Sequence, residues 1–105
     1  MAKYVLVYKG GGGMAQDAAA QQQIMEQWGQ WFGSLGDRVV DGGNPFGPSA
    51  SIGSDGAVSN GGSTGLTGYS IIKGDSLQAA TEAARGCPVL SAGGSVEVYE
   101  TFDVM

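Results

Sequence analysis

The sequence predicts an α+β fold, built as a single domain over residues 1–105. Three observations support this prediction. Lys3–Tyr8 and Tyr69–Lys73 are rich in β-branched and aromatic residues, as strands are. The stretch from Ala15 to Leu35 carries apolar residues at helical spacing, and Ser95–Tyr99 alternates between apolar and polar residues. A chain of 105 residues has room for one core of modest size.

The first predicted strand, Lys3–Tyr8, is followed by the glycine run Gly10–Gly13. Glycine loses more backbone entropy than any other residue in a regular element, so the run predicts a loop. Together with Ala15 the run also fits the G-x-G-x-x-A pattern of a dinucleotide-binding turn. Any glycine run satisfies that pattern, and 105 residues are too few for a full doubly wound sheet. We therefore favour a loop over a nucleotide site.

A long helix is predicted from about Ala15 to Leu35. Its apolar face carries Ile24, Trp28 and Trp31, with Phe32 beside them. Helical spacing of the aromatic residues is better explained by core packing than by stacking on a ligand.

Two glycines, Gly29 and Gly33, interrupt this helix. Each costs about 1 kcal/mol relative to alanine in an exposed helix. We expect a close approach of the backbone to the sheet to compensate for this cost, and we expect the helix to end at Gly36.

The middle of the chain predicts a short strand, a turn and a hairpin. Arg38–Asp41 is β-like and is followed by turn residues at Gly42–Pro45. Ala50–Ile52 and Ala57–Ser59 flank Asp55-Gly56, a pair that strongly favours a hairpin.

The last third predicts a loop, a strand, a helix and a strand. Asn60–Gly68 is polar and glycine-rich, which predicts a mobile loop before the strand Tyr69–Lys73. Asp75-Ser76 can cap the alanine-rich stretch that follows, and Gly86-Cys87-Pro88 ends it. Ser95–Tyr99 is the final strand.

In this order the elements form the βαββαβ pattern of a ferredoxin-like fold with a small hairpin insertion. Such a fold places two helices on one face of a four-stranded antiparallel sheet and leaves the other face bare. Because these strands are apolar on both faces, a monomer would leave apolar side chains in water. We predict that two sheets pack face to face as a homodimer, a dimeric α/β barrel, with a small organic ligand in the cleft between them.

Five segments at the two ends of the chain carry a family resemblance: Lys3–Tyr8, Gly68–Ile72, Asp75–Leu77, Ala83–Pro88 and Gly94–Val98. They resemble the YCII-related, or DGPF-domain, family of the dimeric α/β-barrel superfamily. The resemblance implies a ferredoxin-like subunit, a homodimeric barrel and a small-molecule site. Some relatives are thought to be enzymes that use a His–Asp pair, but this chain has no histidine. Where relatives often carry an Asp-Gly-Pro-Phe motif, residues 60–65 read Asn-Gly-Gly-Ser-Thr-Gly.

Strand alternation assigns side chains to the two faces of the sheet. On the first strand, Val5 and Val7 are assigned to the side of the helices. This assignment leaves the cleft face to Tyr4, Leu6 and Tyr8.

On the last strand, Val96 and Val98 are assigned to the helices, which places Glu97 and Tyr99 in the cleft. The predicted site residues are Glu97 and Asp41 as acid–base groups, and Tyr8, Ser70 and Tyr99 as ligand-binding groups. A carboxylate inside an apolar barrel indicates function. The alternative is an ion pair of Glu97 with Lys3, Lys73 or Arg38.

Composition argues against several other classes of function. The net charge of −5 disfavours nucleic acid as a partner, because such binding depends on clustered Lys and Arg. Without histidine the usual transition-metal ligand sets are absent, so we expect no metal and no cofactor. The single Cys87 cannot form an internal disulfide and is predicted to be structural. The sequence shows no signal-peptide pattern and no apolar run approaching about 18 residues, which predicts a cytoplasmic protein with no membrane partner.

The first functional hypothesis is therefore a small-molecule-binding homodimer with Glu97 as the ligand anchor or proton acceptor. The alternative is a small lyase, isomerase or monooxygenase-like enzyme that acts on a small cyclic or aromatic acid through Glu97, Asp41 and tyrosine side chains. The absence of histidine, the commonest proton-transfer group near neutral pH, disfavours the enzyme. A third hypothesis is a structural or regulatory interaction module whose barrel is filled by side chains.

Overall fold

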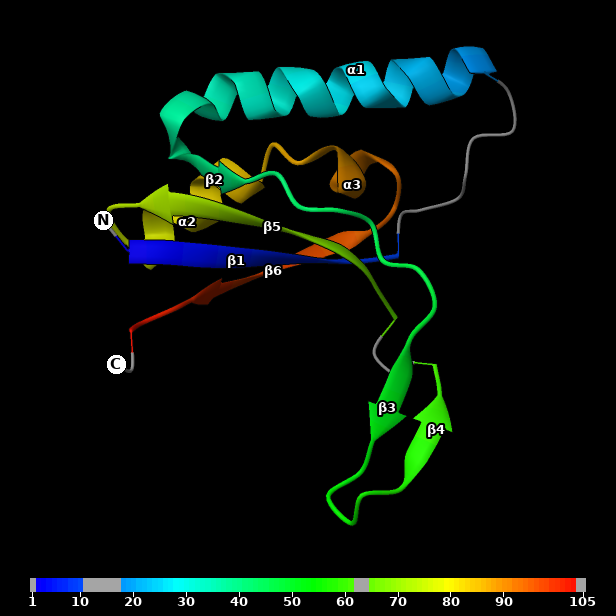
Figure 1. Cartoon of the computed structure of the whole chain (residues 1–105). Helices are drawn as coiled ribbons and strands as arrows, with labels where there is room; N and C mark the ends of the chain where they lie inside the picture. Colours follow the sequence, from blue (N-terminus) through cyan, green and yellow to red (C-terminus); the bar gives the residue numbers. More distant parts are fainter. Residues whose placement is uncertain (1, 11–17, 62–64, 104–105) are drawn as a thin grey trace.

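The computed structural model describes residues 2–10, 18–61 and 65–103 (Figure 1). The elements in chain order are β1 (Ala2–Lys9), α1 (Ala18–Leu35), the 3-10 turn η1 (Gly36–Arg38), β2 (Val39–Asp41), β3 (Ala50–Ile52), β4 (Val58–Asn60), β5 (Leu66–Gly74), α2 (Leu77–Ala84), α3 (Pro88–Ser91) and β6 (Ser95–Glu100). One 4-stranded sheet has the order β2-β5-β1-β6 with antiparallel neighbours, and β3 and β4 form a separate 2-stranded hairpin. The helices lie on one side of the larger sheet, so the chain is of mixed α+β type.

Strand β1 lies in the interior of the sheet and sets its register. It pairs with β5 from Ala2 opposite Gly74 to Tyr8 opposite Gly68. On its other side it pairs with β6, where Leu6 lies opposite Val98. Residues opposite one another share a face, so the burial of β1 decides which side chains of β5 and β6 point to the helices.

The face of β1 that meets the helices differs from the sequence prediction. Tyr4, Leu6 and Tyr8 are 1%, 0% and 5% exposed and belong to the core, whereas Val5 and Val7 lie half-buried on the opposite face. Both faces of this strand are apolar, so alternation alone shows which residues share a face and not which face is covered. The two rings and the leucine fill the space beneath the helices, as close packing of a core requires.

Helix α1 packs against the core through its C-terminal half. Trp31 and Leu35 are buried, and Trp28 and Phe32 are partly buried against the same cluster. The Trp31 indole Nε1 donates a hydrogen bond to the Ala83 carbonyl at 3.0 Å, which joins α1 to α2. The predicted core role of these aromatic residues is therefore confirmed. The predicted helix start at Ala15 and the glycine run after Gly10 lie outside the described residues.

The two glycines of α1 do not make the predicted close approach. Gly29 and Gly33 are exposed, and a Cβ added at either would meet nothing within 4 Å. Close approach occurs instead after β2, where Gly43 has φ +76 and an added Cβ would lie 1.7 Å from the Tyr69 carbonyl oxygen. Only glycine fits at Gly43, because both its backbone angle and its neighbour exclude a side chain.

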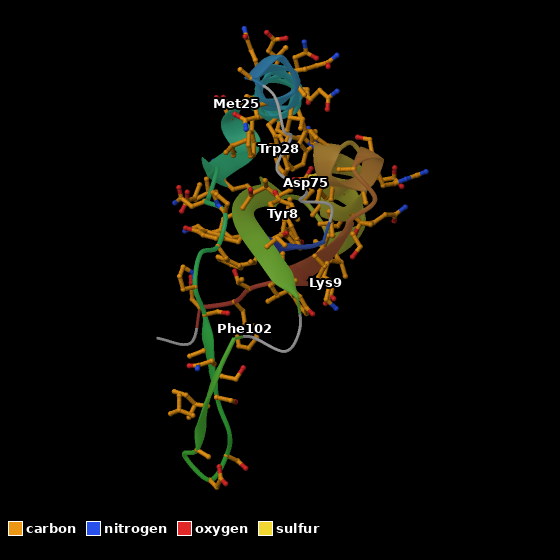
Figure 2. The ribbon with its side chains drawn as sticks, turned by 90° about the vertical axis from the view of Figure 1, so that its right-hand side faces the viewer. Tyr8, Lys9, Met25, Trp28, Asp75 and Phe102 are labelled. Atoms are coloured by element: carbon orange, nitrogen blue, oxygen red, sulfur yellow. The ribbon has the colours of Figure 1, made fainter. Side chains whose placement is uncertain are left out.

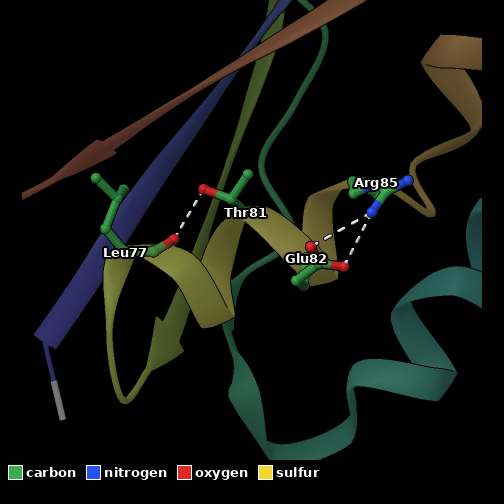
Figure 3. Close-up of polar contacts among 4 residues, drawn as sticks. All are labelled: Leu77, Thr81, Glu82 and Arg85. Atoms are coloured by element: carbon green, nitrogen blue, oxygen red, sulfur yellow. Dashed lines mark hydrogen bonds and ion pairs between the residues drawn. The ribbon is translucent and has the colours of Figure 1, made fainter.

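Helix α2 begins as predicted, with Ser76 as its cap. The Ser76 hydroxyl oxygen accepts a hydrogen bond from the Ala79 amide at 3.1 Å. Figure 3 shows further polar contacts along the helix: Thr81 Oγ1 donates to the Leu77 carbonyl at 2.8 Å, and Arg85 Nη1 donates to both carboxylate oxygens of Glu82 at 3.3 Å. The exposed Glu82–Arg85 pair contributes little to stability.

The chain does not simply turn after α2. Pro88 opens a further short helix, α3, which buries Val89 in the core. Proline at the first helical position has the required φ and has no amide to leave unpaired. The sequence prediction took the same proline as a stop and therefore missed α3.

The predicted hairpin is confirmed. The Asp55 carboxylate accepts a hydrogen bond from the Ala57 amide at 2.9 Å, and Gly56 takes the positive φ of the turn, +86. The predicted loop over Asn60–Gly68 is wrong at its ends, because Asn60 belongs to β4 and β5 begins at Leu66. The hairpin projects away from the larger sheet on the side opposite the helices (Figures 1 and 2).

Candidate functional site

The face of the sheet opposite the helices, called here the open face, has an apolar centre. Val5 and Val7 of β1 lie on it, and Ile71 of β5 lies opposite Val5. The described helices all lie on the other side of the sheet (Figures 1 and 2). The half-buried side chains at this centre therefore form a continuous apolar floor.

One tyrosine–carboxylate pair borders this floor on β6. Glu97 and Tyr99 are two residues apart and share the open face, as predicted. The Tyr99 hydroxyl donates a hydrogen bond to Glu97 Oε1, and Lys9 Nζ lies 3.3 Å from Glu97 Oε2. Lys9 is thus the ion-pair partner, in place of the predicted Lys3, Lys73 or Arg38.

These contacts determine the protonation states of Glu97 and Tyr99. The hydrogen bond from Tyr99, and after it the contact with Lys9, hold the pKa of Glu97 below its usual value. The same hydrogen bond raises the pKa of Tyr99, because it stabilises the protonated phenol. At neutral pH, Glu97 is therefore an anion beside a neutral hydroxyl.

A second tyrosine–carboxylate pair borders the floor on the other side, at β2 and β5. The Tyr69 hydroxyl donates a long hydrogen bond of 3.4 Å to Asp41 Oδ2, while Asp41 Oδ1 accepts one from the Gly43 amide at 2.8 Å. Phe46 stacks on the Tyr69 ring with 5.9 Å between centroids and 19° between planes. Sequence reasoning found Asp41 but missed Tyr69, because placing Ser70 in the cleft assigned the neighbouring Tyr69 to the covered face.

Two predicted ligand-binding residues lie on the covered face instead. The Tyr8 hydroxyl donates to Ser70 Oγ at 2.6 Å, and Ser70 Oγ donates to the Gly42 carbonyl at 2.7 Å. Ser70 is 0% exposed, and burial raises the pKa of Tyr8. The prediction that Tyr8 and Ser70 face the cleft is wrong: they satisfy each other in the core and tie β1, β5 and the end of β2 together.

Cys87 lies near this buried pair. It is 2% exposed, and burial raises the pKa of its thiol to about 11. The thiol is therefore protonated near neutral pH and is not poised as a nucleophile. The Trp28 ring packs edge-on against the Tyr8 ring, with 5.2 Å between their centroids and 73° between their planes. These contacts agree with the predicted structural role of Cys87.

A groove of about 420 Å³ lies on the helix side, between α1 and the start of α3. It is lined by Gln27, Gln30, Trp31, Ser34, Gly86, Pro88 and Ser91. None of these side chains titrates near neutral pH, so the groove offers hydrogen bonds but no acid–base group. The groove contains none of the predicted site residues.

Among residues 2–10, 18–61 and 65–103, no three His, Cys, Asp or Glu side chains are grouped closely enough to hold a metal ion. No helix in the described ranges combines the length and apolar character needed to cross a membrane.

Comparisons with protein-family models and with curated proteins gave no match. The resemblance to the YCII-related family therefore stays a prediction, and the open face with its two tyrosine–carboxylate pairs is the candidate site.

Proposed function

We propose that the protein is a homodimer that binds a small organic molecule between the open faces of two sheets. The observation that carries the proposal is the apolar floor of Val5, Val7 and Ile71 with a tyrosine–carboxylate pair on each side. The antiparallel order β2-β5-β1-β6 supports a ferredoxin-like subunit, a topology that leaves one sheet face for a second copy. Two such faces in contact would form the dimeric barrel.

The apolar floor of the open face supports a dimer. Val5, Val7 and Ile71 lie half-buried at the centre of this face, on the side of the sheet that no described helix covers. Burying them against a second copy of the same face would give association a favourable free energy.

The polar groups of the open face indicate what kind of ligand fits. The floor would support an apolar body, and the carboxylates of Glu97 and Asp41 would accept hydrogen bonds from hydroxyl or amine groups at its two ends. The lowered pKa of Glu97 makes it a weak base and a good anchor. Binding is therefore better supported than the lyase, isomerase or monooxygenase-like alternative.

Native mass spectrometry of the purified chain tests the proposal. We expect a dimer of 2 × 10.6 = 21.2 kDa that retains a small molecule of defined mass. The variant Glu97→Gln should remain dimeric and lose the molecule, because the anionic anchor is gone. Glu82→Gln is the matched control, since Glu82 also forms an exposed ion pair but lies on α2.

A monomer at micromolar concentration would contradict the homodimer. A dimer that retains no molecule would favour the structural interaction module instead. Equal retention by the parent and by Glu97→Gln would place the ligand elsewhere on the protein.

A further inference from the structure

The β3–β4 hairpin, with the chain that joins it to the sheet, forms an arm of residues 46–61. Its strands pair with each other and with no other strand of the described chain. Near its end, Ile52 lies opposite Val58, and these two side chains are 72% and 67% exposed. The arm therefore carries an apolar cross-strand pair that no other described part of its own chain covers.

A hairpin of this kind needs a partner surface. An isolated two-stranded hairpin is at best marginally stable in water, because it has no face packed against a core. The outer edge of each of its strands also has no neighbouring described strand to pair with. Packing against another surface would bury the Ile52–Val58 pair and would stabilise the hairpin.

The direction of the arm indicates where that surface lies. Figures 1 and 2 show the arm leaving the sheet on the side opposite the helices, the side on which the open face lies. Its base is fixed there, because Phe46 stacks on Tyr69 of the open face and the Phe46 amide donates to the Thr67 carbonyl at 2.9 Å. A molecule seated on the open face would lie beside the arm.

The length of the arm fits the spacing of two packed sheets. Sheets packed face to face are about 10 Å apart, whereas ten extended residues from Phe46 to the turn span up to roughly 30 Å. The arm is thus long enough to cross the gap between two sheets and to run along the side of a partner.

We propose that the arm clasps the second subunit of the homodimer and buries Ile52 and Val58 against it. The inference rests on the proposed homodimer, and its partner is a second copy of this chain. Because the dimer is symmetric, each subunit contributes one arm and receives the other. The arms would thereby add to the contact made by the open faces.

The decisive variant is Ile52→Asp, compared with Met25→Asp. Met25 is a matched control, because it is an apolar residue that is 73% exposed on α1, on the far side of the sheet. We expect Ile52→Asp to raise the dimer dissociation constant, measured by sedimentation velocity over a range of concentrations, at least tenfold. Met25→Asp should leave it unchanged.

The outcomes separate the two proposals. A parent protein that is monomeric would overturn both. A dimeric parent whose dissociation constant is the same in Ile52→Asp would overturn the clasp and leave the open-face dimer intact.

Hydrogen exchange gives a second test with the arm sequence unchanged. Ile71→Asp places a charge on the open face and should yield a monomer. We expect the backbone amides of β3 and β4 to be protected in the parent dimer and to exchange at least tenfold faster in that monomer. Equal exchange rates in the two states would contradict the clasp.

Discussion

The two faces of one sheet use similar residues in different ways. On the covered face, Tyr4, Leu6 and Ile72 are at most 1% exposed beneath the helices. On the open face, Val5 and Ile71, next to them in the chain, remain half-buried. The difference comes from the helix layer, which packs apolar side chains such as Trp31, Leu35 and Ala80 against one face only, because the strands themselves are apolar on both faces.

The tyrosines show the same contrast. Tyr8 of the covered face donates to a neutral hydroxyl, Ser70, that is itself satisfied by a backbone carbonyl. Tyr69 and Tyr99 of the open face donate to carboxylates that remain accessible. The hydroxyl groups of Tyr8 and Ser70 are thus hydrogen-bonded within the fold, whereas the carboxylates of the open face can accept further hydrogen bonds from a ligand.

The largest expected difference is between Ile72→Asp and Ile71→Asp. Ile72 is 0% exposed, so Ile72→Asp buries an unpaired carboxylate and should cost at least about 4 kcal/mol, a large part of the stability of a domain. Ile71→Asp should keep the subunit folded and abolish the dimer. Circular dichroism and light scattering would measure folding and mass for both variants.

Each of these two variants is the control for the other, because the substitutions are chemically identical and lie at adjacent positions. If Ile71→Asp unfolded the chain as Ile72→Asp does, the open face would be part of the core. If Ile71→Asp kept the parent mass, the face would not be an interface.

Local signals in the sequence predicted most elements correctly. The Asp55-Gly56 turn and the Ser76 cap are set by short-range hydrogen bonds, and both are confirmed. The covered face of β1 was not predictable in the same way, because Val5 and Leu6 are both apolar and the choice depends on the shape of the helix layer. Long-range packing therefore explains why Tyr8 and Ser70 were assigned to the wrong face.

The candidate site was predictable only where alternation had a clear polar signal. On β6, the valines at 96 and 98 contrast with Glu97 and Tyr99, so their faces were assigned correctly. Tyr69 was missed, since its strand carries apolar residues on both faces and its partner Asp41 is far away in the sequence. The contact between them depends on strand order, which local patterns do not encode.

A smaller difference is expected between Tyr8→Phe and Tyr99→Phe. Tyr8→Phe removes a buried hydrogen bond and should lower the free energy of unfolding by about 1 kcal/mol, measured by urea denaturation. Tyr99→Phe should instead change the titration of Glu97. It should raise the pKa of Glu97 toward its ordinary value of 4.5, because it removes the strongest contact that lowers this pKa. An NMR titration of the Glu97 carboxyl carbon would measure that shift.

The sign of the pH dependence follows from the direction of the shift. Because folding lowers the pKa of Glu97, its stabilising contribution is present above pH 4.5 and is lost as the pH falls through the folded pKa. Tyr99→Phe should reduce this acid-dependent loss, whereas Tyr8→Phe should leave it unchanged. An unaltered Glu97 pKa in Tyr99→Phe would show that Lys9 alone sets it.

The smallest expected effect on stability concerns Gly33 of helix α1, in the layer that covers one face of the sheet. Gly33 is exposed on α1 with nothing within 4 Å of an added Cβ, so Gly33→Ala should stabilise the fold by about 0.5–1 kcal/mol through helix propensity. Gly43→Ala is the opposite control, since its Cβ would collide with the Tyr69 carbonyl. Thermal unfolding would compare the two variants. Destabilisation by Gly33→Ala would mean that the added methyl group meets a neighbouring molecule. The outer side of the helix layer would then be a second contact surface besides the open face.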